Sequence, residues 1–434
     1  MRAARLLVVL ALAAGCVVTQ HEVSVGSLGD AAAPPRSIEP PGIALCLSGG
    51  GYRAALFHTG VLTELNERGW LPRVRSIAGV SGGAIVGATL AMAWDDLDFD
   101  GTGRARNFDT LVAQRILRLT AETLDVGAVL STFADGGSSR RIAQGYREFL
   151  FGDLHLADLP SGEGVPEFVF LATELSTGIN WEFSKRRMGD RRLGYMDTPD
   201  VRLADAVAAS SAFPAVFRPI RVEFAAEDLT LAEPTEAEVK AWTLAALRDM
   251  GRDDRARALE SAGLSETDQL ALAAEFQKFQ QLAFADKIDD GVYLIDGGLM
   301  NNLGSEYCKS AGLNIISTAS TRWVGEVEEE PGGLISSMAR IIVAMRRYAE
   351  ARQLEELQHR SVVGRQLSGA CGPGLNCDRG TVALIELSPR ELRGDIRQAL
   401  RVVARLRAVD PDVQRELLDW GNTRAAASLT ALEH

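Results

Sequence analysis

Basic residues are in short supply in this sequence. Its 434 residues include 46 Lys and Arg against 58 Asp and Glu, which gives a formal net charge of -12. Nucleic-acid binding needs clustered basic side chains that displace counterions from phosphates, and no basic stripe is visible. The composition therefore argues against a nucleic-acid partner. It also predicts that membrane attachment comes from an anchor or an apolar patch, because bulk negative charge is repelled by anionic lipids.

Cysteine is also scarce, with five in the whole chain. After Cys16 they are Cys46, Cys308, Cys371 and Cys377, and none has zinc-finger spacing with histidines. No metal site is expected from them. Cys371 and Cys377 enclose a short Gly-Pro loop, which predicts a disulfide between them in an oxidising compartment. Cys46 lies inside an apolar run and is expected to be a packed thiol.

One short apolar run carries a targeting signal. Residues 6–14 follow two arginines and are too few to span a bilayer, and Cys16 comes soon after them. This layout is typical of a signal peptide. Its ending resembles a bacterial lipobox, with Ala13 where Leu is usual. We therefore expect residues 1–16 to be a lipoprotein signal with lipidation at Cys16; a plain secretory signal cut near Ala14 is the alternative.

The composition changes after the signal. Residues 17–42 are rich in Ala, Ser, Gly and Pro, which predicts a flexible tether. The protein is thus expected to be exported and anchored to a membrane, facing the periplasm or the cell exterior, or otherwise to be secreted. The remaining residues, 43–434, suffice for one large domain.

Strand and helix patterns alternate in residues 43–434. This order predicts an α/β fold with a mainly parallel sheet covered by helices. The expected helices that follow the first two strands cover 54–68 and 82–94, and the expected strands are 43–47, 74–78, 168–173, 292–295, 313–317 and 382–387. Two helical stretches interrupt the pattern: an insertion at about 225–290, and residues 333–357, which are expected to pack on the sheet.

Histidine is rare, which limits the choice of a catalytic base. His21 lies in the tether and His434 is the last residue, so His58, His155 and His359 remain. None of the three occupies a convincing loop at a strand end, where α/β proteins place their ligands. His58 is expected to be an ordinary residue on a helix face. A histidine-dependent α/β-hydrolase that uses His359 stays the alternative among enzymes.

Glycine, by contrast, clusters around a serine. Residues 79–83 read Gly-Val-Ser-Gly-Gly, a G-x-S-x-G between an expected strand and helix. In such a nucleophile elbow the small residues, here Gly79 and Gly83, permit a strained conformation that exposes the hydroxyl of the serine, here Ser81. A plain glycine-serine connection is the alternative for this motif alone.

A second glycine cluster lies one strand-helix unit upstream. Gly49, Gly50 and Gly51 follow Ser48, again between an expected strand and helix. Consecutive glycines let backbone N–H groups approach a developing oxyanion, so the segment predicts an oxyanion hole. A phosphate loop is disfavoured, because the G-x-x-x-x-G-K-[ST] pattern is missing and Ala54 stands where a G-x-G-x-x-G motif needs its last glycine.

A carboxylate occupies a strand end of the kind that the histidines lack. Asp296 directly follows the expected strand 292–295 and precedes two glycines. A carboxylate at the carboxyl edge of the sheet, partly desolvated, can accept the proton of a serine. A simple Asp-Gly turn is the alternative for this motif alone.

Together these blocks resemble the patatin-like phospholipase family and the related cytosolic phospholipases A2. The resemblance covers roughly residues 43 to 320, with a gap at 225 to 290. The sequence departs from the family at Ser48, where Asp is usual, and at Ala54, where Gly is usual. The matching blocks, in order, are GGGYR at 49–53, GVSGG at 79–83, ATELSTG at 172–178, ASSAFP at 209–214 and DGG at 296–298.

The resemblance implies a serine lipid acyl hydrolase: a phospholipase, lysophospholipase or esterase that needs no cofactor. Ser81 would form an acyl-enzyme, and Asp296 would activate first Ser81 and then water. Gly49, Gly50 and Gly51 would line the oxyanion hole, with Arg53 supporting the loop. From another class, the alternative is a membrane-tethered protein of patatin fold that has lost catalysis and binds lipid or a partner.

A cluster of acidic residues invites comparison with a calcium site. Asp96, Asp98 and Asp100 are followed by Gly101, like the start of an EF-hand loop, but Asn107 stands at the twelfth position, where a bidentate Glu is needed. An acidic surface turn is favoured over calcium binding.

The insertion has helical patterns of its own. Thr235 and Glu238 form a possible capping box for a first helix, which ends at Gly251. The apolar face of this helix comprises Val239, Trp242, Ala246, Leu247 and Met250. A second helix is expected to begin near Ser265. Because the insertion leads into the Asp296 strand, we predict a lid over the active-site edge. A helical pair packed elsewhere for stability is the alternative.

Overall fold

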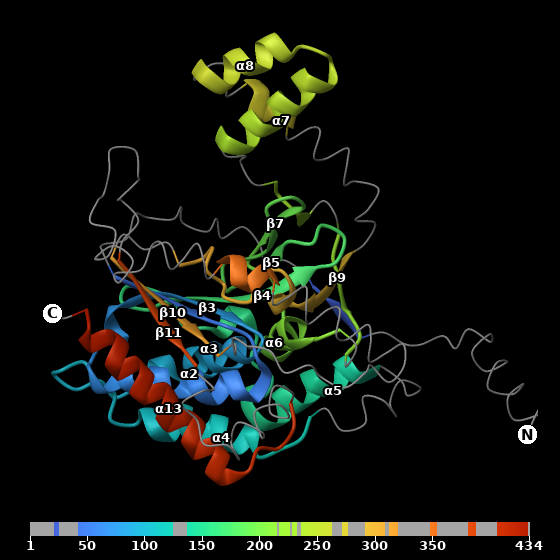
Figure 1. Ribbon diagram of the computed structural model, residues 1–434. Coiled ribbons are helices and arrows are strands. Elements are labelled where there is room, and N and C mark those ends of the chain that lie inside the picture. Colours follow the sequence, from blue (N-terminus) through green and yellow to red (C-terminus); the bar gives the residue numbers. More distant parts are fainter. Residues whose placement is uncertain are drawn as a thin grey trace, which may run out of the picture.

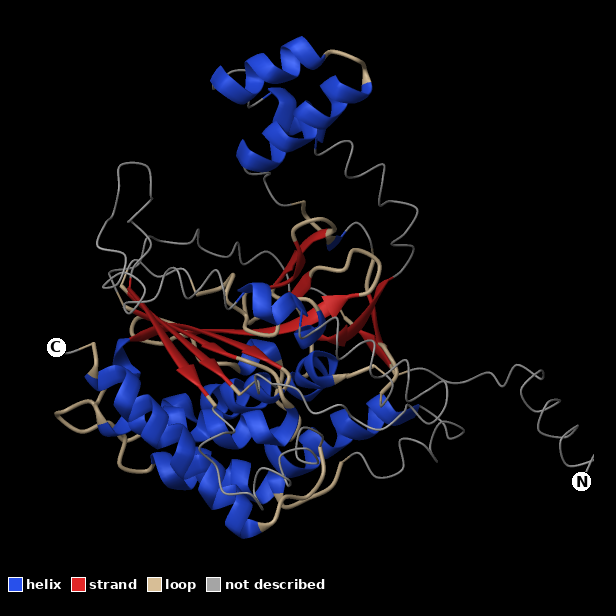
Figure 2. Cartoon of the chain, in the orientation of Figure 1, coloured by secondary structure: helices blue, strands red, loops and turns tan. Residues whose placement is uncertain are grey.

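A computed structural model gives the fold of the chain. The structure describes residues 21–25, 42–124, 137–214, 217–225, 228–231, 236–262, 271–276, 291–308, 312–319, 348–353, 381–387 and 406–432. Figure 1 shows a sheet with α2, α3, α4 and α13 gathered on one side and the helices α7 and α8 standing apart on the other side. Figure 2 shows the same layers, with the strands between the two groups of helices. The expected α/β architecture with a mainly parallel sheet is confirmed.

The strands form one mixed sheet in the order β1-β8-β9-β4-β3-β2-β10-β11, with β5, β6 and β7 attached beside β4. Strands β4, β3, β2, β10 and β11 run parallel. The strands are β1 (Glu22–Ser24), β2 (Ile43–Leu47), β3 (Val74–Val80), β4 (Glu167–Glu174), β5 (Asn180–Phe183), β6 (Arg187–Asp190), β7 (Gly194–Asp197), β8 (Ile220–Glu223), β9 (Gly291–Asp296), β10 (Leu313–Thr318) and β11 (Thr381–Glu386).

The helices connect and cover these strands. The α-helices are α2 (Gly51–Glu67), α3 (Gly82–Ala93), α4 (Gln114–Thr120), α5 (Gly137–Tyr146), α6 (Leu203–Ser211), α7 (Glu236–Asp249), α8 (Asp253–Ala262) and α13 (Pro411–Thr430). Shorter helical turns are η1 (Leu71–Arg73), η2 (Trp94–Asp96), η3 (Asp109–Ala113), η5 (Arg147–Phe151), η6 (Leu156–Asp158) and η8 (Gly297–Leu299).

The six strands expected from the sequence are all present, as β2, β3, β4, β9, β10 and β11. Helix α2 starts at Gly51 instead of 54, so its first turn begins inside the glycine cluster. Of the expected helix over 333–357, the structure describes residues 348–353, which are helical.

The central strands are buried on both faces. In β2, all five residues are buried. One face packs against the helices, and the other, with Cys46, Ala78 and Leu171 among its residues, packs against Leu303. Burial on both faces explains why these strands are continuous apolar runs without alternation.

Helix α13 closes the helical layer by packing directly on α2. A Cβ atom at Gly60 of α2 would lie 1.9 Å from the carbonyl oxygen of Leu418, and one at Gly421 of α13 would lie 2.0 Å from that of Phe57. The two backbones thus touch where each helix has a glycine. This contact joins two helices that lie far apart in the sequence.

Part of the expected flexible tether is a strand. Glu22–Ser24 forms β1, which pairs in parallel with β8. The side chains of Val23 and Val25 are buried, and the Val25 N–H donates to the Glu223 carbonyl oxygen at 2.9 Å. The tether expectation therefore does not hold for residues 21–25; the rest of the segment, up to residue 41, lies outside the described residues.

Cys46 is not the packed thiol that the sequence predicts. It forms a disulfide with Cys308, with their Cα atoms 6.1 Å apart. The bridge joins β2, two residues before Ser48, to the segment that follows η8. The predicted pair Cys371 and Cys377 lies outside the described residues.

The insertion folds as a helical unit. Val239 of α7 and Ala256 of α8 are buried, and the ring of Trp242 lies 5.6 Å from that of Phe276. Met250 is 67% exposed and does not belong to the expected apolar face. Thr235 of the expected capping box and the expected helix start near residue 265 lie outside the described residues. Figure 1 shows α7 and α8 clear of the rest of the molecule.

Among the described helices, none has both the length and the apolar character needed to cross a bilayer.

Two strands meet end to end along one edge of β4. The last pair between β3 and β4 joins Val80 to Leu171. The last pair between β9 and β4 joins Asp296 to Ala172, the next residue on β4. Strand β5 pairs with Leu171 and with Ala172, so it occupies the edge of β4 that lies opposite both β3 and β9. Strands β3 and β9 therefore lie along the same edge of β4. The carboxyl ends of β3 and β9 therefore face each other.

Candidate active site

Ser81 lies where β3 leaves the sheet. Its backbone has φ 52° and ψ -115°, a strained region for a residue with a side chain. The chain must turn here, because Asp296 of β9 occupies the next place on β4. Glycine is required around the turn: a Cβ atom at Gly83 would lie 2.1 Å from the Leu47 carbonyl oxygen, and one at Gly79 would lie 2.7 Å from that of Gly83.

The end of α6 holds the backbones of both predicted catalytic residues. The Ser81 N–H donates to Ser210 Oγ at 2.8 Å, and Ser210 Oγ donates to the Leu171 carbonyl oxygen at 2.6 Å. The Asp296 N–H donates to the Ala212 carbonyl oxygen at 3.0 Å. The sequence offers the Ala-Ser block only as a point of resemblance, and the structure gives it this bracing role.

Asp296 has a defined orientation. It is 4% exposed, and its Oδ1 atom accepts a hydrogen bond from the Gly298 N–H at 2.7 Å. Thr173 Oγ1 donates to the Asp296 carbonyl oxygen at 3.1 Å. A Cβ atom at Gly297 would lie 3.2 Å from Val80 Cγ1, so the turn after Asp296 packs against the residue before Ser81. The structure thus brings the predicted nucleophile and base to one point of the sheet.

The glycine cluster lies beside Ser81. A Cβ atom at Gly49 would lie 3.3 Å from Ser81 Cβ. Gly50 and Gly51 have φ values of 145° and 59°, which favour glycine. Arg53 is buried, and its Nη2 atom would lie 3.2 Å from a Cβ atom at Gly50. The guanidinium therefore packs against the loop.

One of the predicted oxyanion donors is already engaged. The Gly49 N–H donates to the Asn302 carbonyl oxygen at 3.1 Å. Gly49 lines the site next to Ser81, but its N–H points to the segment after η8. This leaves the N–H groups of Gly50 and Gly51, at the N-terminus of α2, as the candidate donors.

Residues 45–231 match the model of a protein family described as patatin-like phospholipase. Over these residues the chain is similar to patatin-like phospholipases. The patatin-like match contains the glycine cluster and Ser81, and it ends before Asp296. It also contains the block around Ser210, whose hydrogen bonds reach both Ser81 and Leu171.

Solved structures are similar to the chain at low identity. Human GIVD cytosolic phospholipase A2 has 18% identity and a TM-score of 0.29, over 39% of this chain and 28% of that chain. VipD from Legionella pneumophila has 13% identity and a TM-score of 0.32, over 95% of this chain and 70% of that chain. The chain thus spans 28% of the length of the human protein. No match was found among curated proteins.

The described histidines have partners other than Ser81. His21 Nε2 lies 2.9 Å from Asp205 Oδ1, and His155 Nδ1 lies 2.5 Å from Asp200 Oδ1. His58 is buried and hydrogen-bonded at both ring nitrogens, so it is not the helix-face residue that the sequence predicts. His359 lies outside the described residues.

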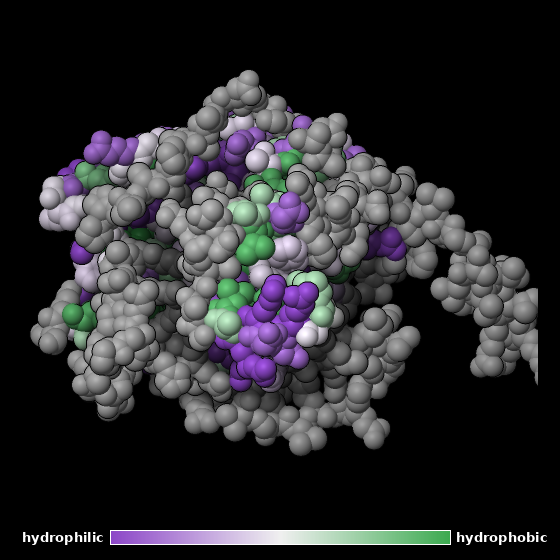
Figure 3. All heavy atoms as spheres, turned by 90° about the horizontal axis from the view of Figure 1, so that it is seen from above, coloured by the Kyte–Doolittle hydropathy of each residue, from purple (hydrophilic) through white to green (hydrophobic). Residues whose placement is uncertain are grey.

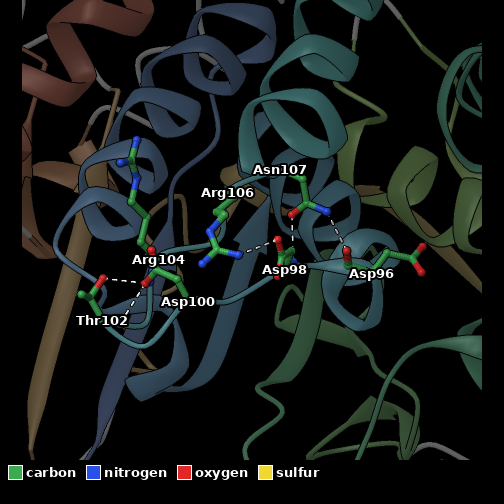
Figure 4. A network of polar contacts seen from close by, with 7 residues as sticks. All are labelled: Asp96, Asp98, Asp100, Thr102, Arg104, Arg106 and Asn107. Atoms are coloured by element: carbon green, nitrogen blue, oxygen red, sulfur yellow. Dashed lines mark hydrogen bonds and ion pairs between the residues drawn. The ribbon is translucent and has the colours of Figure 1, made fainter.

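The acidic residues near Asp100 form a turn held by the chain itself (Figure 4). Asp100 Oδ1 accepts from the Thr102 hydroxyl at 2.6 Å, and Asp98 pairs with Arg106 at 3.3 Å. Figure 4 shows the Asp96 carboxylate directed away from Asp98 and Asp100. Within the described ranges, no group of three His, Cys, Asp or Glu side chains is placed to hold a metal ion.

A turn at the end of β4 lies beside the segment after Asp296. Glu174 is buried and accepts the Ser176 N–H at 2.9 Å, and Met300 Cε would lie 4.0 Å from a Cβ atom at Gly178. Leu175 and Met300 are 51% and 46% exposed. Seen from above, the coloured residues show small apolar groups among polar ones (Figure 3).

Proposed function

We propose that the protein is a serine acyl hydrolase that acts on carboxylic esters of lipids, with Ser81 as nucleophile and Asp296 as base. The observation that carries this proposal is the meeting of β3 and β9, because it puts the strained serine and the carboxylate at one point. The similarity of residues 45–231 to the patatin-like phospholipase family supports lipid esters as the substrate class.

Acylation follows from this arrangement. Ser81 Oγ attacks the ester carbonyl carbon while its proton passes to the Asp296 carboxylate. The negative charge that develops on the carbonyl oxygen is stabilised by the N–H groups of Gly50 and Gly51, helped by the positive end of the α2 dipole. The tetrahedral intermediate then expels the alcohol, which takes the proton from Asp296.

Deacylation repeats these steps with water. Asp296 accepts a proton from a water molecule as the water oxygen attacks the acyl carbon. The second tetrahedral intermediate uses the same N–H groups. Its collapse releases the fatty acid, and the proton held by Asp296 returns to Ser81 Oγ. A single carboxylate therefore serves both halves of the reaction, and no histidine takes part.

The dyad is tested by single substitutions. Ser81→Ala and Asp296→Asn should each lower the hydrolysis of phospholipids and nitrophenyl esters by at least about 100- to 1,000-fold. His155→Ala, which changes a histidine paired with Asp200, should retain most activity. A fluorophosphonate probe should label Ser81 in the wild type. Unlabelled Ser81 in a folded protein would favour the binding protein without catalysis.

We also propose that the protein is a bacterial lipoprotein anchored through Cys16. The sequence of the first 16 residues supports this. Lipidation would supply the membrane contact that the net charge of -12 disfavours.

Cys16→Ser should release the protein from membranes into the soluble fraction. Mass spectrometry of the wild type should give a mature N-terminus at a modified Cys16. An unmodified N-terminus elsewhere would contradict the anchor and leave the hydrolase proposal untouched.

A further inference from the structure

His58 has no place in the proposed chemistry, yet it is completely buried next to the glycine cluster. Its Nε2 atom lies 2.9 Å from the Ser48 carbonyl oxygen, and its Nδ1 atom lies 2.8 Å from Ser317 Oγ. A carbonyl oxygen can only accept, so Nε2 carries the proton and Nδ1 accepts from the Ser317 hydroxyl. Burial lowers the pKa of His58 to about 4, with a contribution from Arg53, so the ring is neutral at neutral pH.

The bond from His58 fixes the first peptide unit of the loop. That unit carries the Ser48 carbonyl on one side and the Gly49 N–H on the other. His58 Nε2 donates to the carbonyl, and the Asn302 carbonyl oxygen accepts from the N–H at 3.1 Å. Because the two partners lie on opposite sides, the plane of this peptide cannot rotate without losing a buried hydrogen bond.

The Ser48 hydroxyl extends this control to the next peptide unit. Ser48 Oγ accepts from the Ala319 N–H at 3.0 Å and donates to the Gly49 carbonyl oxygen at 3.3 Å. In a trans peptide the Gly50 N–H points away from the Gly49 carbonyl. The Gly50 carbonyl in turn accepts the Ala54 N–H at 3.4 Å, which directs the Gly51 N–H out of the N-terminus of α2.

We propose that His58 is a positioning residue for the oxyanion hole: acting through Ser48, it fixes the peptide planes that aim the N–H groups of Gly50 and Gly51 at the substrate carbonyl oxygen. The inference rests on the proposed function. It gives a role to Ser48, which stands where the family usually has Asp. It also replaces the expectation, drawn from the sequence, that His58 is an ordinary residue on a helix face.

Two substitutions of His58 separate its two bonds. The amide nitrogen of Gln reaches the place of Nε2, whereas that of Asn reaches the place of Nδ1. His58→Gln should therefore keep the donor to Ser48 and stay within about threefold of wild-type kcat/KM. His58→Asn should lose that donor and fall by roughly ten- to a hundredfold with KM little changed, the scale of a misaligned oxyanion donor.

A pair of inhibitors reports on the oxyanion hole itself. An alkyl trifluoromethyl ketone adds to the serine and forms an oxyanion, whereas the methyl ketone of equal chain length binds mainly through its chain. In His58→Asn the inhibition constant of the trifluoromethyl ketone should rise by the same factor as kcat/KM falls, and that of the methyl ketone should not change. A merely structural role would weaken both or neither.

Two further variants complete the design. Asn66 lies on the same helix, buried and hydrogen-bonded to Ala105 at both amide atoms, so Asn66→Ala should lower stability while leaving kcat of the folded enzyme unchanged. Ser48→Ala should raise the inhibition constant of the trifluoromethyl ketone, but not that of the methyl ketone, as His58→Asn does. If His58→Asn does not fold, Ser48→Ala tests the proposal in its place.

Wild-type kcat/KM and ketone affinity in the folded His58→Asn or Ser48→Ala variant would overturn the proposal, as would equal losses in His58→Gln and His58→Asn. The failure of the proposed function looks different, since a wild-type protein would then show no hydrolysis that depends on Ser81.

Discussion

Burial decides the protonation of His58. The pKa of this ring is lowered from 6.5 to about 4, first by burial, with the hydrogen bond to Ser48 acting in the opposite direction and Arg53 adding to the lowering. As the pH falls from 6.5 to 4, the unfolded chain takes up a proton that the folded protein refuses. The folded state therefore loses stability through this window, and the loss from this group levels off below about pH 4.

This linkage can be measured. The free energy of unfolding of the wild type should fall between pH 6.5 and 4, with about 3 kcal/mol of the fall due to His58. In His58→Gln the part of this fall that is due to His58 should be absent. Urea denaturation of both proteins at a series of pH values gives the difference, and parallel curves for the two would contradict a neutral buried ring.

The sequence identifies residues whose chemical roles are indicated by short motifs. Ser81 and the glycine cluster stand out by local spacing, and Asp296 stands out as a carboxylate at a strand end. Ser210 contacts Ser81 and Leu171, and His58 contacts Ser48 and Ser317, through hydrogen bonds that residue spacing does not reveal. Asn302 contributes a backbone carbonyl, and no side-chain pattern predicts the partner of a backbone group.

At the scale of elements, the buried central strands were predictable because burial on both faces leaves continuous apolar runs. Strands β5, β6 and β7 have four residues each and form a small antiparallel extension, too short for a clear pattern. The sequence does not predict strand β1, because this strand lies within a stretch whose composition is typical of a linker. Its pairing with β8 is what orders it.

The disulfide links two elements on which the site depends. Cys46 belongs to β2, which leads into the glycine cluster, and Cys308 follows the turn after Asp296. The double substitution of Cys46 and Cys308 by Ser should lower the free energy of unfolding by about 2–4 kcal/mol, because the bridge restricts the unfolded chain.

A reducing agent should destabilise the wild type by about this amount more than it destabilises the doubly substituted protein, which keeps the predicted Cys371–Cys377 bridge. Chemical denaturation with and without dithiothreitol makes the comparison. If the wild type does not respond to the reductant, the bridge does not form. Labelling of both Cys46 and Cys308 by a thiol reagent before reduction would lead to the same conclusion.

At the scale of the whole molecule, the insertion is attached at two neighbouring points. Glu223 of β8 pairs with Gly291 of β9, so the segment between them leaves and rejoins the sheet at one place. The α7 and α8 unit also has its own small core around Val239 and Trp242. Both features favour a domain that folds without it.

Replacement of residues 232–284 by a short Gly-Ser linker should therefore give a folded protein. Its hydrolysis of small esters should survive, whereas its hydrolysis of long-chain lipids should fall or change in selectivity, as predicted for a lid. Equal loss of both activities, or no change in either, would leave the insertion a separate helical unit without a role over the site.

The end-to-end meeting of β3 and β9 also has a consequence for biosynthesis. The ribosome makes β3 and Ser81 early and Asp296 late, and the crosslink from β2 spans 262 residues. Domains complete their folding only when all of their strands are available. Under the proposed mechanism, a nascent chain that stops short of Asp296 holds a serine without a base. On this proposal the chain has no hydrolase activity until most of it has been made, so it would not hydrolyse membranes that contact the growing polypeptide.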